Sequence, residues 1–171
     1  KVIEESDKDI IIVLHQMGNH GPAYYKRYPQ EFERFTPTCQ TNQLEECTQE
    51  EIANAYDNSL LYTDYFLSQT VQLLKGYEED IDTAMFYMAD HGESLGEGGF
   101  YLHGLPYFIA PDAQKHVASL VWFGKDFPVD KTDLKKRASN EYSQDNLFST
   151  LLGLFDVQTE VYEKEMDILR D

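Results

Sequence analysis

The sequence predicts an α/β fold in which helices cover a mainly parallel β-sheet. Residues 10–14 and 83–89 form two apolar runs of strand length, and residues 49–74 between them follow the period of an amphipathic helix. A strand, a helix and a second strand in this order are typical of a right-handed parallel crossover. The length of 171 residues fits a single domain.

The first predicted strand lies close to the start of the chain. Residues 10–14 (IIIVL) are aliphatic throughout and predict a strand that is buried on both faces of the sheet. A natural amino terminus rarely begins so near a central strand. We therefore expect the chain to be the C-terminal portion of a longer protein.

The long helix has recognisable start and stop signals. Thr48 and Glu51 have the spacing of a capping box, in which each side chain bonds to the backbone N–H of the other residue. Apolar side chains then recur every three or four positions from Ile52 to Leu74. Gly76 is expected to end the helix in a left-handed conformation.

Further elements follow the long helix. Residues 83–89 and 117–123 predict two more buried strands, and the apolar positions from Leu147 to Phe155 predict a last helix after Ser143. Ligands of such sheets bind at the carboxyl ends of the strands. The loops at residues 15–21 and 90–99 should therefore meet at one edge of the sheet.

The charge of the chain limits its partners. The 14 basic and 31 acidic residues give a formal net charge of −17. This charge repels phosphate backbones and anionic lipid headgroups, which argues against nucleic-acid binding. No apolar run approaches the ~18–20 residues of a membrane span, and no charged-then-apolar leader opens the sequence. The sequence as given is expected to be a soluble piece.

The two cysteines, Cys39 and Cys47, lie in a polar stretch without a histidine or further cysteine at zinc-finger spacing. We interpret them as a local disulfide, which would indicate an oxidising compartment such as the periplasm or the cell exterior. Two free thiols are the alternative.

The strongest local signal for chemistry is the adjacent pair Asp90 and His91, because carboxylate and imidazole groups are both ligands of Zn²⁺. Both side chains reach one ion only where the backbone bends, and Gly92 permits such a bend. In the alternative interpretation, Asp90 caps a turn and a backbone carbonyl satisfies the His91 ring.

Other polar residues should join this pair. His20 and His103 lie in glycine- and proline-rich loops, and the predicted topology brings these loops and Glu93 to the same edge of the sheet. Such a convergence of histidines and carboxylates favours a functional site. We interpret His15 and His116, which flank predicted strands, as structural.

A rival motif overlaps this region. Residues 92–96 (GESLG) match the Gly-x-Ser-x-Gly pattern of a nucleophile elbow, with Ser94 as the nucleophile. An elbow continues directly into a helix, whereas residues 96–99 (GEGG) break helices. A serine hydrolase that uses Ser94 is therefore an alternative function with poor local context.

Several segments together resemble, in their order and spacing, the phosphoethanolamine transferases that modify lipid A: residues 15–22 (HQMGNHGP), 56–58 (YDN), 90–97 (DHGESLGE), 103–107 (HGLPY) and 143–148 (SQDNLF). The resemblance covers most of the chain. It implies the α/β/α sandwich of the alkaline phosphatases and sulfatases, with residues 1–171 as the C-terminal portion of one catalytic domain.

The resemblance also implies roles for individual residues. Asp90 and His91 match zinc ligands of the family. His20 and His103 match catalytic residues of the substrate site, which hold a phosphate or a second zinc ion. Glu93 is implied to bind the ethanolamine ammonium of the substrate.

The implied reaction is zinc-dependent transfer of phosphoethanolamine from phosphatidylethanolamine to a lipid A phosphate, through a covalent enzyme intermediate. The nucleophilic threonine, a further glutamate ligand and the membrane helices of the family precede the matching region. We therefore expect the chain to be inactive alone, with the missing upstream segment as its partner. The implied location is the periplasmic face of the bacterial inner membrane, and Cys39 and Cys47 match a disulfide of the family.

Other functions stay open at this point. A sulfatase or a phosphodiesterase of the same superfamily is the nearest alternative to the transferase. A non-catalytic acidic domain that binds calcium or a protein partner is a further alternative, although the acidic residues lack the spacing of an EF-hand.

Overall fold

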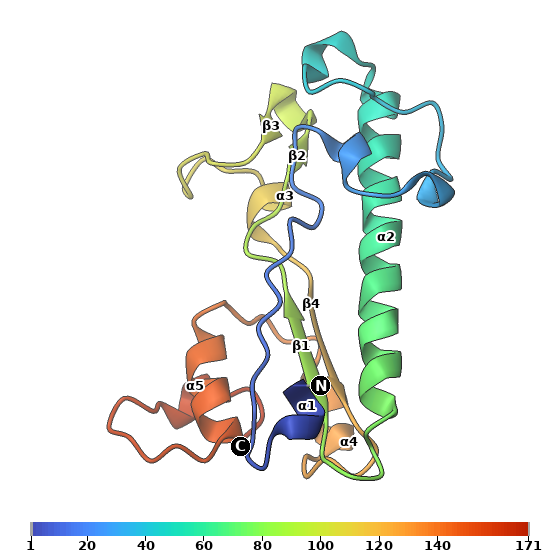
Figure 1. Ribbon diagram of the computed structural model, residues 1–171. Helices are drawn as coiled ribbons and strands as arrows, with labels where there is room; N and C mark the ends of the chain where they lie inside the picture. The colour runs from blue at the N-terminus through green and yellow to red at the C-terminus, as the bar shows by residue number, and fades with distance from the viewer. Residues whose placement is uncertain (1, 171) are drawn as a thin grey trace. The chain divides into compact units, whose positions relative to one another are not determined.

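The structure is a computed structural model that describes residues 2–170. The chain divides into two compact units, one of Lys1–Leu14 with Pro128–Asp171 and the other of His15–Phe127. The helices are α1 (Val2–Glu5), α2 (Gln49–Lys75), α3 (Asp112–Lys115), α4 (Lys131–Arg137) and α5 (Asn146–Leu154), and the strands are β1 (Ala84–Met88), β2 (Ser94–Leu95), β3 (Tyr101–Leu102) and β4 (Ser119–Phe123) (Figure 1).

Helix α2 begins as its sequence predicts. The Glu51 N–H donates to Thr48 Oγ1 at 3.3 Å, and the Thr48 N–H donates to Glu51 Oε2 at 2.7 Å, so both bonds of the capping box are present. The predicted left-handed cap at Gly76 is wrong, because its φ is −64°. The Gly76 N–H bonds to the carbonyl of Leu73 at 3.0 Å, which tightens the last turn and satisfies this carbonyl without a left-handed residue.

The buried face of α2 holds polar as well as apolar side chains. Asn58 is fully buried, and its Oδ1 accepts hydrogen bonds from the backbone N–H groups of Arg34 and Phe35 at 2.7 and 2.9 Å. Its Nδ2 donates to the carbonyl of Phe35 at 2.8 Å. One asparagine therefore satisfies the backbone of a turn that approaches the middle of the helix.

The predicted disulfide between Cys39 and Cys47 is present, with 5.7 Å between the two Cα atoms. The Cys39 N–H donates to the carbonyl of Glu51 at 3.0 Å, so the cysteine loop lies against the first turn of α2. The hydrophobic core of the unit His15–Phe127 lies around this contact. Its buried residues are Tyr24, Cys39, Leu44, Ile52 and Ala55.

The predicted strands at residues 83–89 and 117–123 are present as β1 and β4, but the predicted burial of β4 is wrong, because Ser119, Leu120 and Val121 are exposed. The two strands pair with each other in an antiparallel register that sets Phe86 opposite Val121, beside α2 in Figure 1. Strands β2 and β3 form a second antiparallel pair. Both sheets of the described residues are thus two-stranded and antiparallel, and the predicted parallel pairing is not found among these residues.

The predicted strand at residues 10–14 is wrong for the described chain. These residues are extended but belong to no strand, and their side chains are exposed, up to 80% for Val13. An apolar run becomes a strand only when a neighbouring strand pairs with its backbone. Among residues 2–170 no segment pairs with this run, whereas β4 pairs with β1.

The C-terminal helix is confirmed as α5, at Asn146–Leu154. The compact unit that contains α5 also contains a fully buried carboxylate, Asp167, which accepts a hydrogen bond from the Tyr162 hydroxyl at 2.9 Å. The Leu169 N–H donates to the same carboxylate at 2.9 Å. No helix between residues 2 and 170 combines the length and the apolar character that a membrane crossing requires.

Candidate functional site

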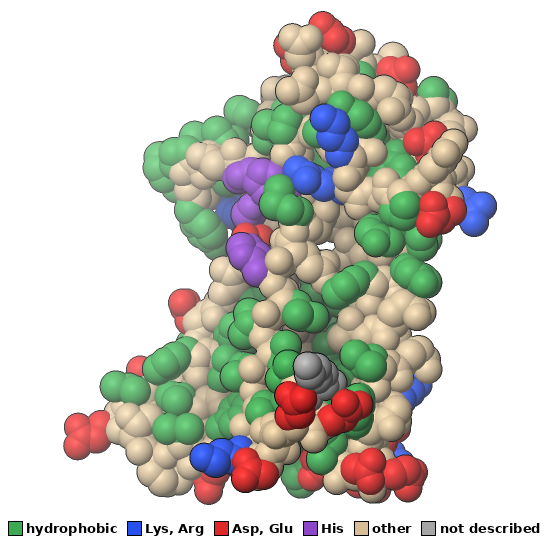
Figure 2. Space-filling view, in the orientation of Figure 1, with side chains coloured by type: hydrophobic (Ala, Val, Ile, Leu, Met, Phe, Trp, Pro, Cys, Tyr) green, Lys and Arg blue, Asp and Glu red, His purple; other side chains and the backbone are tan. Residues whose placement is uncertain are grey.

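Three histidines gather within the unit His15–Phe127. His20 precedes the short 3₁₀ helix η1 (Tyr24–Lys26), His91 follows β1, and His103 follows β3. One nitrogen of each ring lies within 4.8 Å of the corresponding nitrogens of the other two rings. The ring centroids of His91 and His103 are 3.9 Å apart, and Figure 2 shows histidine side chains gathered on the visible face. The prediction that these loops meet at one place is confirmed.

The Nδ1 atom of each ring faces an oxygen atom. In His20 and His91 this oxygen is the carbonyl of the following residue, at 2.7 and 3.0 Å. In His103 it is a carboxylate oxygen of Glu93, at 3.1 Å. Because these oxygens accept hydrogen bonds, the neutral rings carry their proton on Nδ1. Nε2 is then the nitrogen with a free lone pair for a metal ion or a proton.

Glu93 connects two of the histidine loops. Its side chain is 4% exposed, and it accepts hydrogen bonds from the Gly21 N–H at 3.1 Å, the Tyr24 hydroxyl at 2.9 Å and His103 Nδ1. A buried carboxylate is stable only with such partners. Burial, and then the neighbouring Glu93 charge, raises the pKa of Tyr24, so this hydroxyl stays a donor. The geometry favours a positioning role over the direct contact with an ammonium group that the resemblance implied.

Asp90 lies next to His91 but outside the group of three histidines. Its side chain is 81% exposed, and its Oδ1 accepts the His91 N–H at 3.0 Å and lies 3.9 Å from His91 Nε2. The hydrogen bonds of the alternative interpretation, a turn closed by Asp90 and a ring satisfied by a backbone carbonyl, are therefore both present. They leave His91 Nε2 available, so they do not exclude a metal ligand.

Helix α2 holds the loop that carries His20. Asn19 Nδ2 donates to Ser59 Oγ at 2.7 Å, and the Thr63 hydroxyl donates to Asn19 Oδ1 at 3.2 Å. Arg27 Nε donates to the carbonyl of His20 at 2.7 Å. These anchors were not predicted from the sequence. The available signal was the pair Ser59 and Thr63, two polar residues four positions apart on the buried face of a helix.

Ser94 lies in β2 and is fully buried, and its Oγ accepts a hydrogen bond from Gln114 Nε2 at 2.9 Å. A serine nucleophile must be reachable by substrate and have a base beside it. The position of Ser94 thus argues against the serine hydrolase. His15 and His116 lie outside the histidine group and are exposed, so His15 is not packed at the end of a strand. The interpretation of both as structural residues stays a prediction.

Comparison with known sequences identifies the family of this chain. The sulfatase family matches residues 1–157. The chain is 54% identical over 173 residues to "Phosphoethanolamine transferase EptA" of Salmonella typhimurium, covering 98% of the chain and 32% of that protein. It is 43% identical over 170 residues to "Phosphatidylethanolamine transferase Mcr-1" of Escherichia coli, covering 99% of the chain and 30% of that protein.

Solved structures support the same assignment. The soluble domain of lipooligosaccharide phosphoethanolamine transferase A from Neisseria meningitidis matches with a TM-score of 0.94 and 46% identity, over 98% of this chain and 52% of that one. The C-terminal periplasmic domain of phosphoethanolamine transferase EptC from Campylobacter jejuni matches with a TM-score of 0.89 and 51% identity, over 99% and 54%. The α/β fold class of the alkaline phosphatases, predicted from the sequence, is confirmed. The chain belongs to the sulfatase family.

Proposed function

We propose that the protein containing this chain transfers phosphoethanolamine from phosphatidylethanolamine to a lipid A phosphate. One observation carries the proposal: three histidines converge within 4.8 Å in a chain that is 43–54% identical to curated phosphoethanolamine transferases. The chain spans 32% of the length of the first of these relatives. The remaining parts of the reaction therefore fall to segments that this chain does not include.

The histidine group fits a zinc ion. Zinc takes three protein ligands and a water or substrate in catalytic sites, and it prefers neutral imidazole nitrogen. His91 Nε2 and the Asp90 carboxylate, 3.9 Å apart, would hold this ion together with ligands outside the chain, and His20 and His103, whose nitrogens lie within 4.8 Å of that of His91, would keep Nε2 for the substrate or for a second ion. When bound, zinc would polarise a phosphoryl oxygen and lower the pKa of a coordinated hydroxyl.

The residues of this chain act on the phosphoryl group. In the proposed reaction, a threonine hydroxyl outside the chain attacks phosphorus, and the bond between phosphorus and the diacylglycerol oxygen breaks. The acceptor phosphate then displaces the threonine oxygen. Nε2 of His20 or His103 accepts the proton that the attacking group releases, and the resulting Nε2–H then donates to a phosphoryl oxygen or returns the proton to the leaving oxygen. Glu93 keeps His103 oriented.

The proposed location is the periplasmic face of the bacterial inner membrane. Of the similar solved proteins, one is described as a periplasmic domain and another as an integral membrane protein. The disulfide between Cys39 and Cys47 is compatible with an oxidising compartment. A formal charge of −17 repels an anionic bilayer, so membrane helices outside this chain would serve as its tether.

The test uses the full-length protein in membranes, with a fluorescent phosphatidylethanolamine as donor and lipid A as acceptor. His91→Ala should abolish formation of fluorescent diacylglycerol and lower the zinc content measured by mass spectrometry. His116→Ala is the matched control, because His116 is exposed and outside the group, and it should change neither. Unchanged zinc content and transfer in His91→Ala would refute the proposal. Activity that survives a zinc chelator but stops in Ser94→Ala would instead support the serine hydrolase.

A further inference from the structure

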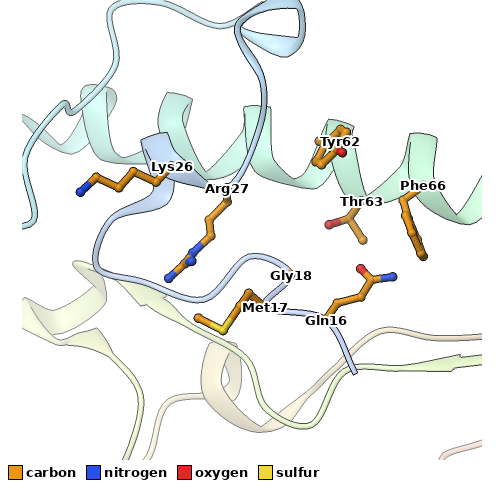
Figure 3. A pocket seen from close by; sticks show the side chains of 8 residues that line it. All are labelled: Gln16, Met17, Gly18, Lys26, Arg27, Tyr62, Thr63 and Phe66. Atoms are coloured by element: carbon orange, nitrogen blue, oxygen red, sulfur yellow. The ribbon is translucent and has the colours of Figure 1, made fainter. Parts of the chain in front are cut away.

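A cavity of about 310 Å³ lies beside the loop that carries His20. One wall is formed by residues 16–18 and the opposite wall by Tyr62, Thr63 and Phe66 of α2, with Lys26 and Arg27 at one end (Figure 3). The size lies at the lower end of the range for small-molecule pockets. The proposed transfer reaction makes no use of this cavity.

The charge of the cavity is opposite to that of the chain. Two of the lining side chains, Lys26 and Arg27, are cationic and none is a carboxylate, although acidic residues outnumber basic residues by 31 to 14. Among residues 2–170 neither cation forms an ion pair with a carboxylate. Lys26 Nζ lies 5.3 Å from the ring centroid of Tyr25, which is a weaker contact than an ion pair.

Arg27 is the better anchored of the two cations at this end of the cavity. The residue is partly buried, and its Nε donates to the carbonyl of His20 at 2.7 Å. Figure 3 shows the guanidinium near the end of the Met17 side chain. A charged group that is partly removed from water is stabilised by an anionic partner. No carboxylate among residues 2–170 forms an ion pair with Arg27, so an anion from outside these residues can take this place.

The geometry of the hydrogen-bond donors in this cavity favours a phosphate group. The two Nη groups of an arginine form a planar fork that binds two oxygens of a phosphate, and a neighbouring lysine adds a point charge. The space beside Gly18 is open, and Gln16 lies farther along the same wall, near Phe66 (Figure 3). The aromatic rings of Tyr62 and Phe66 on the opposite wall favour an apolar body attached to this phosphate.

We propose that this cavity is a phosphate-binding subsite, in which Arg27 and Lys26 hold a phosphate group next to the histidine cluster. The identification of its ligand with a phosphate of the lipid substrate rests on the proposed function, whereas phosphate binding itself does not. The Arg27 hydrogen bond to His20 connects the subsite directly to the loop of a reacting residue.

The experiment measures binding rather than turnover. The chain is titrated with inorganic phosphate and, separately, with dodecyl phosphate below its micelle concentration, and heat and the Nε–H resonance of Arg27 are followed. Arg27→Gln should weaken phosphate binding by about tenfold and Lys26→Gln by about threefold. Lys135→Gln removes an exposed cation of α4 outside the cavity and is the matched control, which should leave binding unchanged. Circular dichroism of each variant confirms that it is folded.

The two phosphate sources give different results. Tighter binding of dodecyl phosphate identifies a lipid phosphate as the ligand, and equal affinities identify free phosphate. Phosphate could also bind at the histidine cluster, and His103→Gln separates the two sites because it should leave Arg27-dependent binding intact.

Phosphate affinity that is the same in Arg27→Gln and the wild-type chain overturns the subsite while leaving the transferase proposal standing. Conversely, Arg27-dependent binding in a full-length protein that transfers no phosphoethanolamine overturns only the proposed function.

Discussion

Each compact unit contains a buried carboxylate with a tyrosine as hydrogen-bond donor, Glu93 in one and Asp167 in the other. Their side chains are 4% and 0% exposed, and each accepts a hydrogen bond from a tyrosine hydroxyl at 2.9 Å, Tyr24 for Glu93 and Tyr162 for Asp167. In both cases burial contributes to raising the pKa of the tyrosine, which keeps its hydroxyl protonated as a donor. The same arrangement thus appears once in each unit.

The remaining partners of the two carboxylates differ. Asp167 accepts the Leu169 N–H at 2.9 Å and lies 3.7 Å from Arg170 Nε, and the charge of an arginine does not change. Glu93 instead accepts a hydrogen bond from Nδ1 of His103, a side chain of the proposed site. A carboxylate with permanent partners stabilises its unit, whereas one that faces a histidine can also orient a reacting group. Substitutions at the two sites should therefore separate stability from activity.

The largest effect on stability is expected for Asp167→Ala. The substitution leaves the partly buried Leu169 N–H without its partner and removes the acceptor of the Tyr162 hydroxyl, so the free energy of unfolding should fall by about 3 kcal/mol. Urea unfolding measures the change. Glu160→Ala is the matched control, because Glu160 is an exposed carboxylate of the same unit, and it should cost at most about 0.5 kcal/mol. Equal losses in the two variants would contradict the structural role of Asp167.

Glu93→Gln should affect transfer by the full-length protein more than stability. The variant keeps the volume of the side chain but replaces the charged acceptor of His103 with an amide, and turnover should fall by about 10- to 100-fold. A merely structural role would leave the His103 ring unchanged. The ¹⁵N signals of this imidazole should show that the preference for a proton on Nδ1 is lost. Wild-type turnover, or unchanged ring signals, would contradict the positioning role.

A smaller effect is expected for Tyr24→Phe. The variant removes one hydrogen bond to Glu93, so the free energy of unfolding should fall by about 1 kcal/mol near neutral pH. Because the pKa of Tyr24 is raised on folding, the folded chain keeps this proton to higher pH than the unfolded chain, and stability falls as the pH rises above ~10. This alkaline decline should be shallower in Tyr24→Phe.

Urea unfolding between pH 8 and pH 11 measures the decline, and a slope identical to that of the wild-type chain would contradict the assignment. Tyr162→Phe provides the matched comparison in the other unit. It removes the tyrosine donor of Asp167 and should leave phosphoethanolamine transfer by the full-length protein unchanged. Slower transfer in this variant would mean that the two carboxylates do not separate stability from activity as proposed.

The sequence alone determined the features whose signals are local. The capping box of Thr48 and Glu51 and the apolar period behind it predicted α2, and the nearby cysteines predicted their own disulfide. The cap and the disulfide were predicted correctly because each is specified by residues a few positions apart. The predicted topology also brought three histidine loops together, and they do meet, although the first strand and the parallel pairing behind that prediction are not found among residues 2–170.

Tertiary structure decided which groups pair. Similar apolar runs at residues 10–14 and in β1 had different outcomes, because only the second is paired by another strand among the described residues. Likewise, nothing near Glu93 in the sequence indicates that it bonds to the backbone of Gly21, 72 positions away. Hydrogen-bond partners across such separations depend on how the elements pack, and a buried carboxylate takes whichever donors the fold brings to it.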